Sequence, residues 1–155
     1  MESTSTGTYV AVTYSDETVK EILRWAKEQG IPNLLKPESI HTTLIYSRKE
    51  LPDFVPHGDI EVKLSKEARL HVFENPGERV LVMKVDPTWL VARNEAITSI
   101  HGAEYDHDEY IPHISLSYDI GDFVVSNKPF TLKKAPVIIN EYKEALNFDY
   151  KDEVK

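Results

Sequence analysis

Two histidines in this sequence each stand two positions before a hydroxyl residue, in segments that alternate polar and apolar side chains. His41 precedes Thr43 in the segment SIHTTLIYS, and His113 precedes Ser115 in the segment IPHISLSYD. The other four histidines have Asp, Phe, Ala or Glu at the corresponding position. A single histidine on a strand is more often a hydrogen-bonded structural residue than a catalyst. The repetition of the pair favours a functional interpretation of both.

Both segments have the period of two that is typical of a β-strand, so each histidine shares a face with its hydroxyl partner. In the first strand this alternation separates His41, Thr43 and Ile45 from Thr42, Leu44 and Tyr46. In the second strand it separates His113, Ser115 and Ser117 from Ile114, Leu116 and Tyr118. The apolar faces predict packing beneath a helix. The histidine faces are too polar to be buried dry, which indicates that they border a cleft.

Phosphoryl transfer is the chemistry that these four residues fit. A neutral imidazole can accept a proton and a protonated one can donate it near neutral pH, because the ordinary pKa of histidine is ~6.5. The hydroxyls of Thr43 and Ser115 can donate to the non-bridging oxygens of a phosphate, where charge grows in the transition state. The arrangement requires no metal ion. The sequence leaves open which histidine is the base and which the acid.

Composition limits the class of protein. The chain has 155 residues, of which 41% are hydrophobic and 28% charged, and we expect one globular domain over 1–155 with short polar tails at 1–7 and 151–155. The absence of cysteine excludes disulfides and thiolate chemistry and agrees with a cytoplasmic location. No apolar run approaches the ~20 residues that span a bilayer. The formal net charge of −8 argues against a surface that tracks a long nucleic acid.

The pattern of elements predicts an α+β fold. Two helices are expected, at 15–30 with Asp16 as its cap and at 86–102 with Asp86 as its cap and Pro87 as its first residue. Strands are expected at 8–14, 40–46, 112–118, 129–140 and 141–150, together with a meander over 59–65, 68–74 and 79–85. Each half contains a helix, a loop and a histidine-bearing strand. We therefore expect two lobes, each an antiparallel sheet with an outer helix, and a central cleft between them.

The segments HTTL at 41–44 and HISL at 113–116 fit the pattern of histidine, any residue, Ser or Thr, and an apolar residue. Two such segments in a small bilobal chain resemble the two-histidine phosphoesterases, a superfamily of metal-independent enzymes whose catalytic cleft lies between two lobes. Within it, the sequence is similar to the anti-CBASS nucleases of tailed bacteriophages, which destroy the cyclic di- and trinucleotide messengers of bacterial CBASS immunity. The organisational match covers nearly the whole chain.

This resemblance implies a metal-independent and cofactor-free phosphodiesterase that cuts 3'–5' bonds in molecules such as 3'3'-cGAMP and cyclic triadenylate, in the cytoplasm of a bacterial host. His41, Thr43, His113 and Ser115 would be the catalytic residues. We expect a monomer whose partner is a small cyclic oligonucleotide, with no long nucleic acid and no membrane. Candidates for stacking on a nucleobase are Tyr9, Phe73, Tyr105 and Tyr110, although aromatic residues more often belong to the core. Glu141 resembles an acidic residue that reads a base amine, and a solvated glutamate is an equal alternative.

Three other functions fit parts of the same sequence. An RNA-end 2',3'-cyclic phosphodiesterase or a 2',5'-oligonucleotide phosphodiesterase would use the same four residues on another substrate. The segment EYDHDEY at 104–110 offers adjacent carboxylates and an imidazole to a metal ion, but adjacent side chains rarely all reach one ion. A non-catalytic protein that sequesters a nucleotide is the third, and the paired catalytic motifs argue against it.

Overall fold

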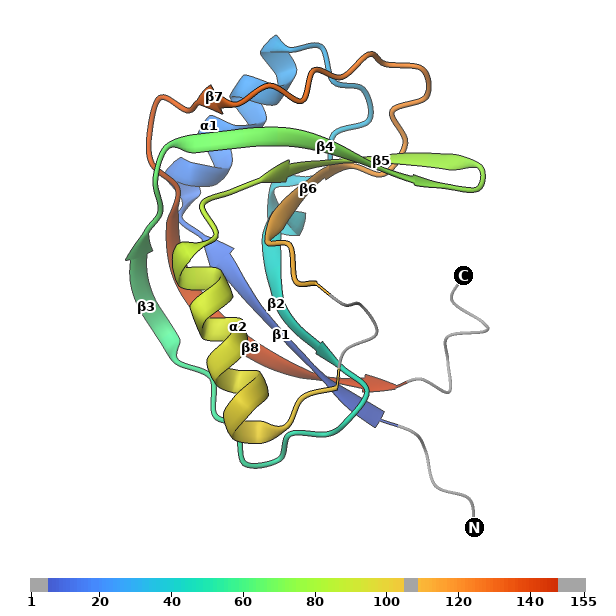
Figure 1. Ribbon diagram of the computed structural model, residues 1–155. Coiled ribbons are helices and arrows are strands. Elements are labelled where there is room, and N and C mark those ends of the chain that lie inside the picture. The colour runs from blue at the N-terminus through green and yellow to red at the C-terminus, as the bar shows by residue number, and fades with distance from the viewer. Residues whose placement is uncertain (1–5, 105–108, 148–155) are drawn as a thin grey trace.

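Two four-stranded antiparallel sheets and two helices make up the fold, which a computed structural model describes for residues 6–104 and 109–147 (Figure 1). The first sheet has the order β2-β1-β8-β3, with β1 Thr6–Tyr14, β2 His41–Ser47, β3 Gly58–Lys63 and β8 Val137–Asn147. The second has the order β6-β5-β4-β7, with β4 Glu67–Asn75, β5 Glu78–Lys84, β6 His113–Ser117 and β7 Phe130–Thr131. The helices are α1 Asp16–Glu28 and α2 Thr88–His101, and a short 3₁₀ turn, η1 Pro37–Ser39, precedes β2. The predicted α+β class with two antiparallel sheets is confirmed.

The strand pairing differs from the predicted meander. The β4–β5 hairpin forms as expected, but β3 pairs with β8 in the other sheet. Every second residue of β3 is exposed, which suits the edge position that it occupies. The two C-terminal strands that the sequence predicted are a short β7 and one long β8, with Pro136 lying just before β8. At the other end β1 begins at Thr6, so the polar tail is shorter than 1–7.

The helix boundaries lie close to the predicted ones, with a difference at each N-terminus. Ser15, and not Asp16, caps α1, because the Ser15 hydroxyl accepts from the amide of Thr18 at 3.1 Å. Asp86 accepts from the amide of Thr88 at 3.0 Å as expected, but Pro87 lies at the N-cap position and not in the first turn. Gly102 ends α2 in the left-handed conformation, with φ of 74°.

Each helix follows a strand of one sheet and packs on the other sheet. The Trp25 ring of α1, the helix after β1, stacks on Phe130 of β7 with centroids 4.4 Å apart. From α2, the helix after β5, Arg93 contacts Glu141 of β8, and Asn94 donates to the Leu44 carbonyl of β2 at 2.7 Å. Figure 1 shows the same exchange, with α1 beside β4 and β7 and α2 crossing β1 and β8. The two lobes are therefore interlocked and form a single unit.

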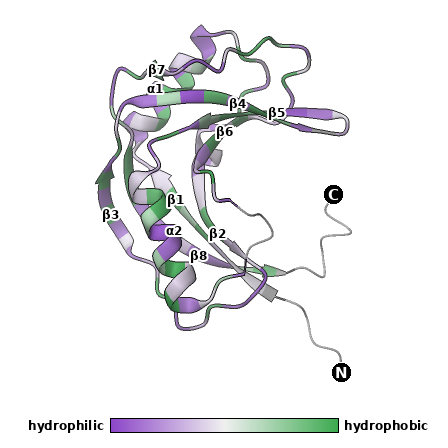
Figure 2. Ribbon diagram, in the orientation of Figure 1, coloured by the Kyte–Doolittle hydropathy of each residue, from purple (hydrophilic) through white to green (hydrophobic). Residues whose placement is uncertain are grey.

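The core lies between each sheet and the helix that covers it. Its largest fully buried side chains include Ile22 of α1, Leu90 and Ile97 of α2, Leu44 of β2 and Leu116 of β6. Figure 2 shows the opposite character at the tip of the β4–β5 hairpin, which is hydrophilic. Within the described residues no helix is both long and apolar enough to cross a membrane.

The two sheets meet where β2 and β6 lie side by side. The chain that leads into β2 fixes this junction, since the Leu35 amide donates to the Leu116 carbonyl at 2.9 Å and Leu34 forms a bridge with Ser117. The two histidine-bearing strands thus become neighbours although they belong to different sheets.

Candidate active site at the junction of the two sheets

The structure brings the four predicted catalytic residues onto these neighbouring strands. His41 and Thr43 lie on β2, His113 and Ser115 lie on β6, and all four side chains are half-buried. The histidines are close enough for the charge of His41 to lower the pKa of His113. Two imidazoles and two hydroxyls therefore face a shared, partly solvated region.

Each imidazole is held by a hydrogen bond of the same kind, from its Nδ1 to a backbone carbonyl two residues upstream. Nδ1 of His41 lies 2.8 Å from the carbonyl oxygen of Ser39, and Nδ1 of His113 lies 2.8 Å from the carbonyl oxygen of Ile111. A carbonyl only accepts, so each Nδ1 carries the proton and donates it. In each ring Nε2 is then the nitrogen that exchanges protons: it accepts when the ring is neutral and donates when the ring is charged. In both cases the backbone two residues upstream sets this state.

The environment of His113 favours its neutral form. Burial lowers the pKa of His113 below its ordinary value of 6.5, and the positive charges of His41, His71 and Lys84 lower it further. The hydrogen bond to Ile111 opposes this effect, but the net direction is downward. A neutral imidazole with a free Nε2 can act as a general base at neutral pH.

Thr43 is fixed by two tyrosines. The Tyr9 hydroxyl and Thr43 Oγ1 are 2.9 Å apart, and the Tyr110 hydroxyl donates to the Thr43 carbonyl at 2.6 Å. Burial raises the pKa of Tyr9 to about 12, although its hydrogen bond with Thr43 opposes the rise, so the phenol stays protonated. When Tyr9 donates this bond, the Thr43 proton is free for a ligand. Tyr9 and Tyr110, predicted as base-stacking residues, thus both hold Thr43 through their hydroxyls.

A β-bulge follows each histidine pair and changes the predicted faces. The register against β1 shifts so that Ile45 and Thr43 of β2 oppose consecutive residues and Leu44 is the extra one. The register against β5 shifts in the same way at Leu116 of β6. Beyond each bulge the alternation reverses. The strict period of two is therefore wrong after Leu44 and after Leu116.

The reversal exchanges which side chains are buried. Ile45 and Ser117, predicted to share the histidine faces, are buried at 2% and 0% exposure. Tyr46 and Tyr118, predicted to pack in the core, are exposed at 42% and 52%. The Tyr46 ring lies 6.4 Å from that of Tyr9, edge to face, and Tyr118 is near enough to contribute to the raised Tyr9 pKa. Two tyrosines that the sequence assigned to the core thus border the site.

Further aromatic rings line both sides of the site. Tyr142 of β8 lies 6.3 Å from Tyr9, measured between ring centroids. On the other sheet Phe73 of β4 lies 5.4 Å from His113 and 4.9 Å from His71, edge to face in both cases. Phe73 therefore lies beside a catalytic candidate, and its stacking on a base stays a prediction. Tyr142 and His71 have no local signal in the sequence, because only strand register shows that they reach this region.

Glu141 lies on the other face of its sheet. It is directly opposite Val12, which in turn is opposite Thr42, whereas Thr43 is on the alternate face. Its side chain is fully buried, and its carboxylate accepts from Arg93 through two bonds of 2.8 Å and from the His57 amide at 2.7 Å. Burial alone would raise the pKa of this carboxyl, but the bonds from Arg93 and His57 hold it below its usual range. The geometry places Glu141 in a structural ion pair, away from the histidines.

A different carboxylate borders the aromatic side of the site. Glu144 of β8 is directly opposite Tyr9 of β1, its side chain is exposed, and its charge contributes to the raised Tyr9 pKa. The parity that separates Glu141 from the histidine face places Glu144 on it. Glu144 was not predicted from the sequence, because its place at the site depends on the register of β8 against β1.

Two remaining predictions concern the loop before β6. Tyr105 and most of the acidic EYDHDEY segment lie outside the described residues. Within the described part of the chain, no three His, Asp or Glu side chains are grouped as they would be around a metal ion.

Comparison with solved structures identifies the architecture. A crystal structure described as a phosphoesterase matches with a TM-score of 0.60 and 15% identity, over 89% of this chain and 86% of its own. E. coli LigT in complex with phosphate matches with a TM-score of 0.56 and 16% identity, over 92% and 88% of the two chains. At these identities the likeness concerns the fold, which is that of the LigT-like phosphoesterases.

Sequence comparison identifies the family. A protein from Salmonella phage S16 named anti-CBASS protein Acb1 is 37% identical over 152 residues, which cover 97% of this chain and 95% of that protein. The protein of the same name from Enterobacteria phage T4 is 34% identical over 152 residues, with the same coverage. The family model described as "Anti-CBASS protein Acb1" matches residues 6–153. The chain therefore belongs to the anti-CBASS protein Acb1 family.

Proposed function

We propose that this chain is a metal-independent phosphodiesterase that cleaves 3'–5' bonds in cyclic oligonucleotides such as 3'3'-cGAMP and cyclic triadenylate, and so counters CBASS immunity in the cytoplasm of the infected host. One observation carries the proposal. Two imidazoles on adjacent strands have the same Nδ1 hydrogen bond, at 2.8 Å in both cases, and each has a hydroxyl residue two positions on. Membership of the anti-CBASS family supports the cyclic nucleotide as the substrate.

His113 is the general base in the proposed mechanism. Its lowered pKa favours the neutral form, whose Nε2 takes the proton from the ribose 2'-hydroxyl beside the scissile phosphate. The 2'-oxygen attacks the phosphorus in line, which forms the 2'-O–P bond and breaks the bond to the 5'-oxygen. His41, in its protonated form, donates from Nε2 to the departing 5'-oxygen. The products are a 2',3'-cyclic phosphate and a free 5'-hydroxyl.

The hydroxyls of Thr43 and Ser115 donate to the non-bridging phosphate oxygens in this mechanism, where negative charge grows as the attack proceeds. Thr43 can do so because the 2.9 Å contact between its Oγ1 and the Tyr9 hydroxyl leaves its own proton available when Tyr9 is the donor. The Tyr110 bond to the Thr43 carbonyl holds the strand in register at this point. Such fixed donors need no reorganisation during the reaction, which is how they lower the barrier.

The nucleobases stack on the aromatic residues beside the histidines. Phe73 adjoins His113, and Tyr9, Tyr46 and Tyr142 form a group on the first sheet. Stacking of one base on an aromatic ring contributes ~1 to 3 kcal/mol and tolerates different bases. In this arrangement Glu144, opposite Tyr9, is the carboxylate within reach of a base amine.

The test is a cleavage panel in EDTA. Purified protein is incubated with 3'3'-cGAMP, cyclic triadenylate, 2',5'-linked oligoadenylate and RNA ends carrying a 2',3'-cyclic phosphate, and the products are separated by chromatography. We expect cleavage of the first two, and a linear product ending in a 2',3'-cyclic phosphate. A cyclic substrate with 2'-deoxyribose at the scissile position should resist cleavage. Preference for either of the other two substrates, or full activity of His41→Ala or His113→Ala, would contradict the proposal.

A further inference from the structure

A row of cationic side chains continues from His113 across the second sheet. The register places Lys84 of β5 opposite His113 of β6, and Arg69 of β4 opposite Lys84. Residues that oppose one another on neighbouring strands project from the same face. With strands about 4.8 Å apart, Arg69 begins about 10 Å along the row from His113. Lys84 is near enough for its charge to contribute to the lowered pKa of both His113 and His71.

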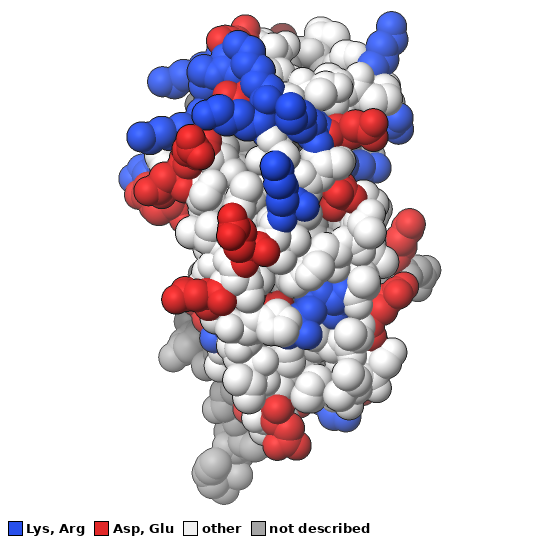
Figure 3. Space-filling model, turned by 90° about the vertical axis from the view of Figure 1, so that its left-hand side faces the viewer, with Lys and Arg blue, Asp and Glu red and all other residues white. Residues whose placement is uncertain are grey.

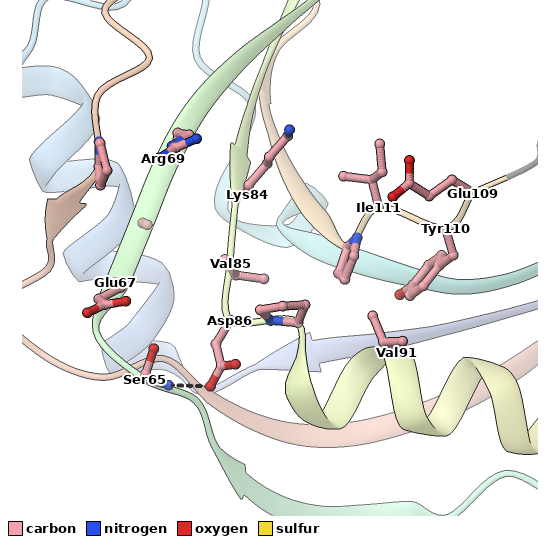
Figure 4. A pocket seen from close by; sticks show the side chains of 14 residues that line it. Ser65, Glu67, Arg69, Lys84, Val85, Asp86, Val91, Glu109, Tyr110 and Ile111 are labelled. Atoms are coloured by element: carbon pink, nitrogen blue, oxygen red, sulfur yellow. Dashed lines mark hydrogen bonds between the residues drawn. The ribbon is translucent and has the colours of Figure 1, made fainter.

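Lys84 and Arg69 line a pocket of about 640 Å³, and Pro112, the residue before His113, lines it as well. Its walls are Ser65 and the start of β4 at 67–69, the end of β5 and the turn after it at 84–87, Val91 of α2, the segment 109–112 that leads into His113, and Pro129. Figure 4 shows Arg69 and Lys84 on neighbouring strands at one side of this pocket and Tyr110 across from them, next to Val91. Tyr110 also bonds to Thr43, so it contacts both the pocket and the catalytic strand.

Arg69 and Lys84 are available to an anion. Among the described residues neither one forms an ion pair, and both side chains are at least partly exposed.

Three carboxylates also line the pocket. Asp86 is engaged by the amides of Ser65 and Thr88, while Glu67 and Glu109 are exposed.

Two cations of the first lobe are already engaged. Arg93 is held by Glu141, and the Lys143 ammonium donates to the carbonyls of Leu51 and Phe54 at 2.8 Å each. The Lys84–Arg69 row, by contrast, adds two side-chain positive charges on the same face of the sheet as His113.

We propose that Lys84 and Arg69 bind the second, non-scissile phosphate of a cyclic dinucleotide while His41 and His113 act on the first. This inference rests on the proposed function, because it requires a substrate with two phosphates on one small ring. Once one phosphate of the cyclic dinucleotide lies between the histidines, the sugar-phosphate ring keeps the second phosphate close to the first. The planar guanidinium of Arg69 can bind two phosphate oxygens at once, and the Lys84 ammonium adds a point charge between the two sites.

Steady-state kinetics on 3'3'-cGAMP test this role at fixed ionic strength and at about pH 8, which lies well above the lowered His113 pKa, so that the effect of Lys84 on that pKa does not change the rate. Arg69→Ala and Lys84→Ala should each raise KM about tenfold and change kcat less than about twofold, because the contact to the second phosphate is the same in the ground and transition states. Arg69→Lys and Lys84→Arg should keep most of the affinity. On the dinucleoside monophosphate ApG, which has one phosphate, the alanine variants should behave like the unmodified protein.

Matched controls remove the same charge elsewhere. Lys63 and Lys133 line a separate pocket that also includes Ser15 and Thr18 of the α1 N-terminus, in the described part of the chain. Lys66 and Lys134 line the same pocket, so the controls remove charge from a region rich in lysine. Figure 3 shows the gathering of Lys and Arg at the end of the molecule where α1 and β4 lie. Lys63→Ala and Lys133→Ala should leave KM unchanged. A similar rise in KM in these controls would mean that bulk charge, and not a site, attracts the substrate.

Other outcomes overturn the inference in distinguishable ways. An unchanged KM in both alanine variants, or a fall in kcat alone, would exclude a second-phosphate site while the unmodified protein still cleaves the cyclic dinucleotide. An equal loss on ApG would move Lys84 to the scissile phosphate. Failure of the unmodified protein to cleave any cyclic dinucleotide would refute the proposed function and remove this inference with it.

Discussion

The ion pair between Arg93 and Glu141 provides the sharpest test of how this fold is held together. The Glu141 side chain is 0% exposed and that of Arg93 is 19% exposed, and their two bonds join α2 to β8. Arg93→Met keeps most of the aliphatic stem but leaves a buried carboxylate whose one remaining hydrogen-bond donor among the described residues is the His57 amide. Breaking a buried pair on one side costs about 3 to 5 kcal/mol. For a chain of this length, that loss corresponds to a fall in Tm of roughly 6 to 20 °C.

A double variant separates the cost of the unpaired charge from the loss of the Arg93 side chain. Glu141→Gln in the Arg93→Met background removes the unpaired charge and keeps an oxygen for His57, so the double variant should be more stable than Arg93→Met alone. Thermal and urea unfolding followed by circular dichroism would measure this coupling. Additive losses would refute the ion-pair account. A stable Glu141→Gln with a large fall in kcat/KM would return Glu141 to the base-reading role suggested by sequence.

The pH dependence of the same variants has a defined sign. Hydrogen bonds from Arg93 and His57 hold the folded-state pKa of Glu141 below its ordinary value of 4.5. The pair therefore contributes stability that is present above that value and is lost as the pH falls through the folded-state pKa. In Arg93→Met, protonation of Glu141 removes the unpaired buried charge and so restores part of the lost stability. The stability difference between this variant and the unmodified protein should thus narrow as the pH is lowered from 7 toward 4.5.

Three further predictions concern catalysis. If His113 is the base, kcat/KM should fall as the pH is lowered, and the midpoint of that fall should lie below pH 6.5. Lys84→Met should move the midpoint to higher pH, because it removes one of the charges that lower the His113 pKa. A midpoint above pH 6.5 in the unmodified protein would contradict the assignment of His113 as the base. Tyr9→Phe keeps the ring but loses the bond to Thr43, so kcat should fall about tenfold with a smaller change in KM; a purely KM effect would indicate that Tyr9 acts through stacking alone. The cleavage rate should be unchanged in about 5 mM EDTA, a large excess over trace divalent metal. A rate that falls in EDTA and returns when Mg²⁺ or Mn²⁺ is added would show a metal requirement.

The catalytic candidates were visible in sequence because their signal is local. A histidine and a hydroxyl two residues apart share a strand face whatever that strand pairs with, so no tertiary information is needed to associate His41 with Thr43. The same holds for the helices, where Gly102 stops α2 through its own conformational preference. Elements defined by short-range patterns were therefore predicted to within a few residues.

Strand register and the sheet to which each strand belongs could not be predicted from such local patterns. Alternation alone puts Glu141 and Glu144 on opposite faces of one strand, but only the pairing of β8 with β1 shows which of the two shares the histidine face. The partner of β3 is another example, since its alternating pattern suits an edge strand of either sheet. Lys84 belongs to the same class, because its neighbour on β6 is fixed by a strand pairing that no segment of the sequence encodes alone.

The two bulges show how a small departure from regular pairing determines the composition of the site. Without the extra residue at Leu44, the period of two would continue, Tyr46 would point into the core and Ile45 would join His41 at the site. The bulge instead buries Ile45 and exposes Tyr46, and the equivalent bulge at Leu116 does the same for Ser117 and Tyr118. Each strand thus presents a histidine, a hydroxyl and then a tyrosine to the same side. In the proposed mechanism a phosphate contacts the first two residues and a nucleobase stacks on aromatic rings beside them, so the bulges would let each strand offer side chains to a whole nucleotide.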